Sequence, residues 1–206
     1  MEHRVFMLAA VALVLAAVCT AQAEVLESCK GDYVCPNFTV VEKHKEFEER
    51  RYVETQWIST RMSSSSTDDM REAYYRLKDF CEKDPEEPAS TLLVSRKTWP
   101  ALISISEDDG TETSVSMSWF VPPGTVLPAT SNPKVTVETR SASTVYVKTF
   151  GGTPNHELAQ DKVKILRKAL DEAGKSFDHH TYAGAGYDNP LNIFITHHNE
   201  IWIYEA

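Results

Sequence analysis

Two pairs of adjacent histidines are the side chains best suited to hold a metal ion. His179-His180 and His197-His198 both lie in polar stretches of the chain. Neutral imidazole is a common ligand of transition metals and of heme iron, so these pairs raise the hypothesis of a metal or heme-iron site. The alternative is that the four side chains belong to loops and strand ends and face water.

The common catalytic motifs are missing from the sequence. The chain contains no H-E-x-x-H pattern, no G-x-S-x-G pattern and no P-loop. Adjacent acids such as Glu48-Glu49 would point to opposite faces of a strand, and such pairs in loops usually meet solvent. The sequence therefore predicts a binding protein and not an enzyme.

The amino terminus has the features of an export signal. A short charged start ends at Arg4, an apolar run follows over residues 5–18, and A-Q-A stands at 21–23. The apolar run is shorter than the roughly 20 residues that span a bilayer. We expect a signal peptide over 1–23 and a secreted mature domain over 24–206, which stays off membranes because no second long apolar segment follows.

Export would allow the cysteines to form disulfides, because disulfides persist in oxidising compartments. Cys19 leaves with the signal, so Cys29, Cys35 and Cys81 remain. Three pairings are open, and we favour one that joins the Cys29/Cys35 segment to Cys81. The cysteine left over offers a disulfide-linked dimer. The sequon N-F-T at Asn37 adds a glycosylation site, expected on the surface.

The charge of the chain disfavours nucleic acid as a partner. The formal net charge is −9, and removal of residues 1–23 leaves it unchanged because Glu2 and Arg4 depart together. An acidic surface repels phosphate backbones, and the sequence has no basic stripe interleaved with aromatic residues.

Two segments have helical periodicity. The first follows the serine run 63–66, with Thr67 as its expected cap, acids in its first turn and a stop before Pro85. Its apolar side repeats at three- and four-residue steps and comprises Met70, Ala73, Tyr74, Leu77, Phe80 and Cys81. The second is expected to begin near residues 153–155 and to end near Gly174.

The remaining segments have strand character. The predicted strands cover residues 38–41, 47–59, 101–106, 114–121, 134–138, 144–150, 193–196 and 200–204. The order is strands, helix, two strands, and then the same again from near Lys134. This predicts an α+β domain of two similar halves that close on each other.

Several ordered motifs together resemble the SOUL heme-binding family. They are FEERRY at 47–52, VYVKTFGG at 145–152, AGYDNP at 185–190 and NEIW at 199–202. The resemblance spans roughly residues 35–204. Within these motifs we interpret Tyr187 and Trp202 as core aromatics, and the glycines as turn positions, with Gly186 supplying a positive φ.

The resemblance implies a fold and a site. Family members form a distorted antiparallel β-barrel flanked by two long helices, and they bind heme or porphyrin in an apolar groove beside the first helix. Residues 69–73 resemble an acidic-x-Arg-Glu-Ala stretch of the family, which places Arg71 against a propionate. Tyr74 and Leu77 would then supply apolar wall. The implied function is an extracellular tetrapyrrole carrier, scavenger or buffer.

One segment departs from the family pattern. After the first helix, residues 95–102 read SRKTWPAL where relatives carry a Lys-Ile-x-Met-Thr-x-Pro-Val stretch that borders the groove. This departure supports an alternative function: a secreted protein-interaction module that keeps the fold and has lost the tetrapyrrole.

Overall fold

The computed structural model describes residues 26, 29–81, 98–108, 111–125, 127, 132–153, 155–187 and 198–206. The predicted signal peptide, the predicted strand at 193–196 and His197 lie outside these residues. Within the described part of the chain, no helix is both long and apolar enough to cross a membrane.

Both predicted helices form, with small differences at their starts. Helix α1 covers Thr67–Cys81, and Ser66, not Thr67, caps it: the Asp69 amide donates to Ser66 Oγ at 3.2 Å. Helix α2 covers His156–Glu172, and Asn155 Oδ1 accepts a hydrogen bond from the Leu158 amide at 2.8 Å. In both cases the cap side chain satisfies an amide that the first helical turn leaves open.

The described residues contain nine strands, which precede, separate and follow the two helices along the chain. Their bounds are β1 Phe38–Lys43, β2 Glu48–Tyr52, β3 Thr55–Met62, β4 Ala101–Asp108, β5 Thr111–Val121, β6 Val135–Arg140, β7 Ser143–Phe150, β8 Thr181–Gly186 and β9 Asn199–Tyr204. One strand prediction was wrong, and one strand was missed. The segment 47–59 is two strands broken at residues 53–54, and β8 was missed because its small residues have low strand propensity.

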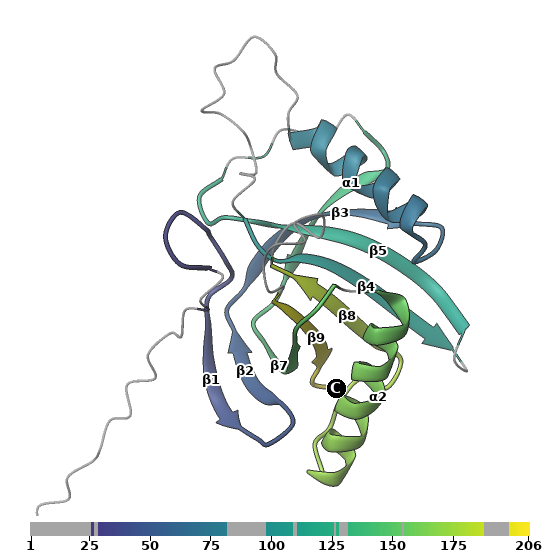
Figure 1. The fold of residues 1–206 in the computed structure, drawn as a ribbon. Helices are drawn as coiled ribbons and strands as arrows, with labels where there is room; N and C mark the ends of the chain where they lie inside the picture. Colours follow the sequence, from purple (N-terminus) through teal and green to yellow (C-terminus); the bar gives the residue numbers. More distant parts are fainter. Residues whose placement is uncertain are drawn as a thin grey trace, which may run out of the picture.

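The strands form one antiparallel sheet that curls into an open half-barrel (Figure 1). Their order is β1-β2-β7-β9-β8-β4-β5-β3-β6. The first half, without β1, comprises β2 to β5, and the second half comprises β6 to β9. If the counterparts β2/β6, β3/β7, β4/β8 and β5/β9 are exchanged, the same order results, read in reverse. The predicted α+β fold of two similar halves is therefore confirmed, and the halves share strands: β2 pairs with β7, and β3 pairs with β6.

Alternation along the strands gives the sheet two apolar faces. In β3, Ile58 packs with the helices, whereas its neighbour Trp57 packs on the other face. The helix-facing cluster includes Leu77 of α1 and Leu166 of α2, so both helices cover the same face. The opposite face holds aromatic side chains from distant strands, namely Phe38, Tyr52, Trp57, Phe120 and Trp202.

Candidate functional site

Helix α1 divides its side chains between the core and the surface. Ala73 and Leu77 are completely buried against the sheet, each with 0% of its surface exposed. Tyr74 is 45% exposed, and the Arg71 side chain is 61% exposed. Of the three residues predicted to line a site, Arg71 and Tyr74 thus share an open surface, while Leu77 lies beneath it and supports the helix from the core.

The exposed surface continues from α1 onto the sheet. Tyr74 meets Trp119 of β5 edge to face, with ring centroids 5.4 Å apart and planes at 61°. Met70, one helical turn before Tyr74, packs partly buried against the core, as Trp119 does. We call the surface made by Met70, Arg71, Tyr74 and Trp119 the α1 flank.

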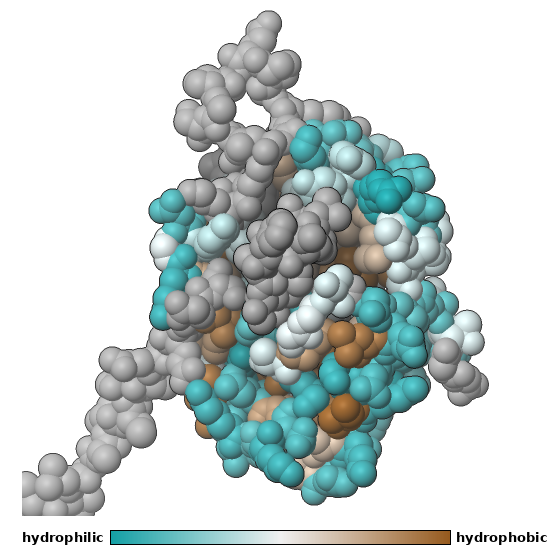
Figure 2. All heavy atoms as spheres, in the orientation of Figure 1, coloured by the Kyte–Doolittle hydropathy of each residue, from teal (hydrophilic) through white to brown (hydrophobic). Residues whose placement is uncertain are grey.

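Next to Trp119 the sheet carries few side-chain atoms. Its register neighbour on β4 is Ala101, and the next residue across, on β8, is Gly186. Gly184 lies on the same face, opposite Ile103. Among the described residues, no atom would lie within 4 Å of a Cβ atom added at either glycine. Counted over the described residues, the helix-facing side of β4 and β8 therefore carries few side-chain atoms beside the α1 flank, and Figure 2 shows apolar surface below α1.

One of the glycine predictions is confirmed and another is wrong. Gly152 has a φ of 92° and lets the chain turn from β7 toward α2, as expected of the motif. The prediction of a positive φ at Gly186 was wrong, since Gly186 ends strand β8 and is not among the glycines with positive φ. Its lack of a side chain matters for the space above the sheet and not for the backbone angle.

The predicted metal histidines are not gathered in the described residues. His179 and His180 occupy an exposed bend, where the His179 ring lies 4.1 Å from the ring of Phe177. His198 stands elsewhere, with its Nε2 3.0 Å from Glu200 Oε1. His197 lies outside the described residues.

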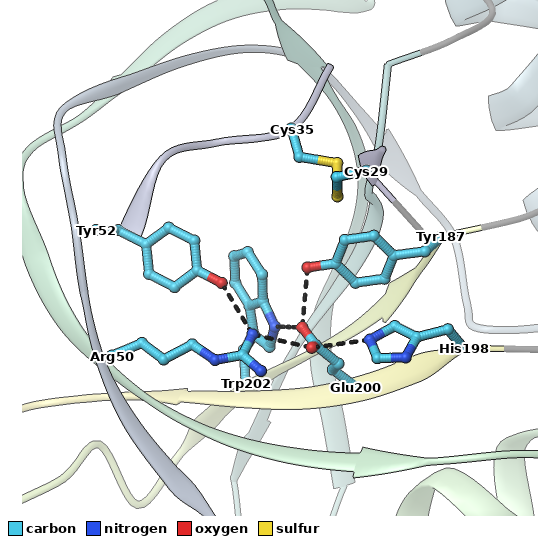
Figure 3. Close-up of a disulfide and its surroundings, with 8 residues drawn as sticks. All are labelled: Cys29, Cys35, Arg50, Tyr52, Tyr187, His198, Glu200 and Trp202. Carbon is cyan, nitrogen blue, oxygen red and sulfur yellow. Dashed lines mark hydrogen bonds and ion pairs between the residues drawn. A yellow bond between two sulfur atoms is a disulfide. The ribbon is translucent and has the colours of Figure 1, made fainter. Parts of the chain in front are cut away.

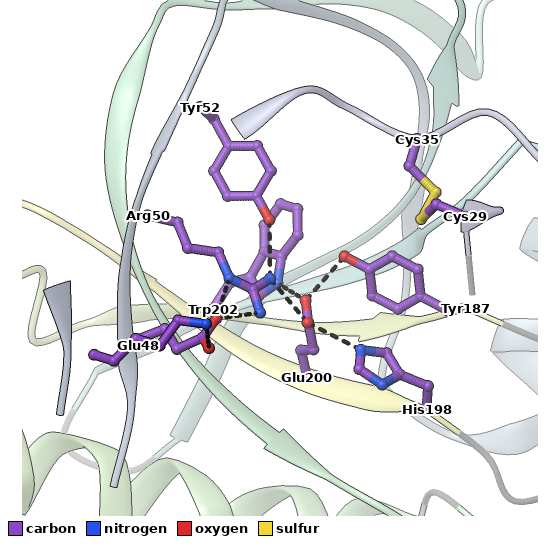
Figure 4. A network of polar contacts seen from close by, with 10 residues as sticks. Cys29, Cys35, Glu48, Arg50, Tyr52, Tyr187, His198, Glu200 and Trp202 are labelled. Atoms are coloured by element: carbon purple, nitrogen blue, oxygen red, sulfur yellow. Dashed lines mark hydrogen bonds and ion pairs between the residues drawn. A yellow bond between two sulfur atoms is a disulfide. The ribbon is translucent and has the colours of Figure 1, made fainter. Parts of the chain in front are cut away.

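Glu200 of β9 is the centre of a buried polar network on the face of the sheet opposite the helices (Figure 3). Its carboxylate accepts hydrogen bonds from Arg50 Nη1 at 2.9 Å, from Tyr187 at 2.9 Å and from Trp202 Nε1 at 2.7 Å. Arg50 also pairs with Glu48 at 2.8 Å (Figure 4). The interpretation of Tyr187 and Trp202 as core aromatics is confirmed, because both are buried and both serve this carboxylate.

The network keeps Glu200 charged inside the protein. Burial alone would raise the pKa of Glu200, but the hydrogen bond with His198 and the charge of Arg50 outweigh it, so the pKa is lowered. Burial raises the pKa of Tyr187 well above its ordinary value, so this phenol remains a donor. With every oxygen of Glu200 engaged, the network is suited to holding the fold and not to chemistry.

The disulfide joins Cys29 to Cys35, with Cα atoms 5.8 Å apart, and not to Cys81 as we had favoured. Cys81 is buried at the end of α1 in the helix-facing cluster, whereas Cys29 and Cys35 pack on the opposite face. The sheet therefore separates Cys81 from both partners. Because Cys81 is 4% exposed, a covalent dimer through it would require the end of α1 to open.

Sequence reasoning missed two features of the α1 flank and the sheet surface beside it. Trp119 lies within the predicted strand 114–121, and only the three-dimensional register places it beside α1. The Gly184/Gly186 surface lies on a strand that was not predicted. The sequence did contain a usable signal for it, since AGAG over 183–186 is a run of small residues of the kind that admits close approach.

Comparison with solved structures shows the same fold in other proteins. The crystal structure of the EcmrR C-terminal domain matches with a TM-score of 0.60 at 10% identity, covering 78% of this chain and 98% of that one. A hydrolase from Listeria innocua matches with a TM-score of 0.53 at 10% identity, covering 81% and 94%. At these identities the likeness concerns the fold alone.

Sequence comparison identifies the family. Heme-binding protein 2 of Homo sapiens is 25% identical over 162 residues, covering 77% of this chain and 78% of the relative. Heme-binding protein 2 of Mus musculus is 24% identical over 164 residues, with the same coverage. The family described as SOUL heme-binding protein matches residues 33–204. The chain therefore belongs to the SOUL heme-binding protein family.

Proposed function

We propose that this protein is an extracellular heme or porphyrin carrier, scavenger or buffer, and that it binds the ring at the α1 flank. One observation carries the proposal: Tyr74 and Trp119 form an aromatic corner on the exposed side of α1, where the exposed Arg71 stands three positions before Tyr74. Membership of a heme-binding family supports a tetrapyrrole as the ligand.

The chemistry of the α1 flank suits a flat ring with carboxylate arms. Aromatic and thioether side chains at Tyr74, Trp119 and Met70 offer apolar contact to a macrocycle. Beside them, no atom of the described residues fills the surface over Gly184 and Gly186. Iron in a bound heme would supply a coordination position, and Met70 and Tyr74 carry donor atoms of the types that heme proteins use.

Arg71 is the residue that would orient the ring. Its Nη1 donates to Asp68 Oδ1 at 3.0 Å, and this contact is exposed to solvent, where an ion pair contributes little. A propionate can therefore replace Asp68 at small cost and gain a charge-assisted hydrogen bond.

Three features support the extracellular setting. They are the signal-like residues 1–23, the disulfide between Cys29 and Cys35, and the exposed sequon residue Asn37. Disulfides and N-linked glycans belong to the secretory route, so the three features agree with one another.

The test is a titration of the mature chain, residues 24–206, with hemin and with iron-free protoporphyrin, followed by absorbance and by Trp fluorescence. Both ligands should bind, and hemin should give a shifted Soret band. Arg71→Ala should weaken binding by about 1 kcal/mol, roughly fivefold in Kd, since the bond is exposed. Tyr74→Ala should cost a similar amount through lost ring contact.

A matched control uses the other helix. Lys168 of α2 is also an exposed cation paired with an acid one turn away, Glu172 at 3.7 Å. Lys168→Ala should leave Kd unchanged. Unaltered spectra at micromolar hemin would defeat the proposal and favour the interaction module, and equal losses in Arg71→Ala and Lys168→Ala would remove the α1 flank as the site.

A further inference from the structure

The β1–β2 hairpin gathers one histidine and two glutamates at the end of the molecule opposite α1 (Figure 1). Glu42 and Glu49 face each other across the two strands, and His44 lies in the turn between them. One ligand atom from each of these residues lies within 4.8 Å of the other two. Among the described residues, this is the group of three acid or histidine side chains close enough to share an ion.

The imidazole of His44 is held in place and aimed at the carboxylates. Its ring stacks on Phe47, with centroids 4.2 Å apart and planes at 17°. Nε2 lies 3.2 Å from Glu42 Oε2, is shielded from solvent, and makes no hydrogen bond of good geometry there. A buried nitrogen in this condition lacks the partner that buried polar atoms normally have.

Lys175, just past the end of α2, supplies the positive charge now beside the two acids. Its Nζ lies 2.6 Å from Glu49 Oε2 and 3.5 Å from Glu42 Oε2. The hairpin thus already attracts one cation, and Lys175 is the group a metal ion would have to displace.

We propose that Glu42, His44 and Glu49 bind a divalent zinc ion, with Lys175 as the competing cation. Imidazole nitrogen together with carboxylate oxygen is a donor set that Zn²⁺ accepts, with a fourth position left for water. Calcium and magnesium prefer oxygen ligands alone, so His44 gives the site its selectivity. The site stands apart from the α1 flank and does not depend on tetrapyrrole binding.

The geometry requires a modest closure. Ligand atoms around a tetrahedral zinc stand roughly 3.3 Å apart, given bonds of about 2.0 Å. The present separations, up to 4.8 Å, exceed this. The Glu42 side chain is 56% exposed and can rotate to close the gap, while the less exposed His44 and Glu49 stay in place.

The experiment is calorimetric titration of Zn²⁺ into mature protein that carries no histidine tag, with a thermal melt as a second readout. Wild type should bind one ion and gain melting temperature. His44→Ala should bind at least about 100-fold more weakly, since losing a direct ligand exceeds the roughly 10- to 100-fold cost of losing an outer partner. Lys175→Met should bind about tenfold tighter, because the opposing charge is gone.

Matched controls separate this site from other histidines. His156 Nδ1 also lies near an acid, 3.8 Å from Glu112 Oε1, and His156→Ala should leave zinc binding unchanged. The double change His179→Ala with His180→Ala should likewise have no effect. Zinc binding that survives His44→Ala, or that appears only in Lys175→Met, would overturn the proposal, as would equal affinity for Ca²⁺.

Discussion

At the scale of single residues, Glu200 is the most deeply buried charged side chain among the described residues. A carboxylate with no solvent contact is tolerated because Arg50, Tyr187, Trp202 and His198 all lie within hydrogen-bond distance. The guanidinium of Arg50 is itself only 2% exposed, so each charge relies on the other.

Glu200→Gln should therefore lower the free energy of unfolding by about 3 kcal/mol at neutral pH, because it leaves Arg50 with Glu48 as its remaining acid. Urea denaturation measures this. Glu138→Gln is the control, since Glu138 is 46% exposed and pairs loosely with Arg140 at 3.7 Å. A loss below that of the control would contradict a structural role for the network.

The same pair of variants tests the pH dependence. The pKa of Glu200 is lowered in the folded state, so its stabilisation is present above the unfolded pKa near 4.5 and is lost as pH falls through the lower folded value. Wild type should lose more stability than Glu200→Gln between pH 7 and strongly acidic solution.

The sequence predicted these residues unevenly. Tyr187 and Trp202 were predicted to be core aromatics from the family motifs. The expectation that Arg71 meets a propionate stays a prediction. The pairing of Arg50 with Glu200 was not predicted, because the two residues are 150 positions apart and only strand register unites them. Leu77 was expected to line the groove, yet a one-dimensional apolar stripe does not distinguish a core face from its edge.

At the scale of elements, the helices were predicted well because capping and periodicity are local signals. Strand pairing is not local. The break at residues 53–54 turns β2 toward β7 and β3 toward β6, so that adjacent segments join different partners. A pattern of apolar and polar residues carries strand positions, and it does not carry this exchange.

Because strands of each half pair with strands of the other half, we predict that neither half folds alone. A fragment of residues 24–133 keeps β2 without β7, β3 without β6 and β4 without β8. It should show no cooperative thermal transition by circular dichroism, whereas residues 24–206 should show one. A sharp melt of the fragment would mean that each half closes its own sheet.

At the scale of the whole molecule, the proposed secretion of this protein leads to a direct prediction. Expression of the full chain in cultured animal cells should release protein whose amino terminus is Glu24 and whose mass falls after glycan removal. Asn37→Gln should abolish that fall, because Asn37 is exposed just before β1. Retention of the chain inside the cells would contradict the extracellular proposal.

The short span between Cys29 and Cys35 has a consequence for biogenesis. The two thiols are six positions apart, so a nascent chain can close this small ring from one local segment, before distant strands have met. Cys81 is the only rival thiol in the mature sequence, and the packing of α1 withdraws it. On the proposed secretory route, oxidation of this protein should therefore depend little on the disulfide-reshuffling enzymes that long-range bridges require.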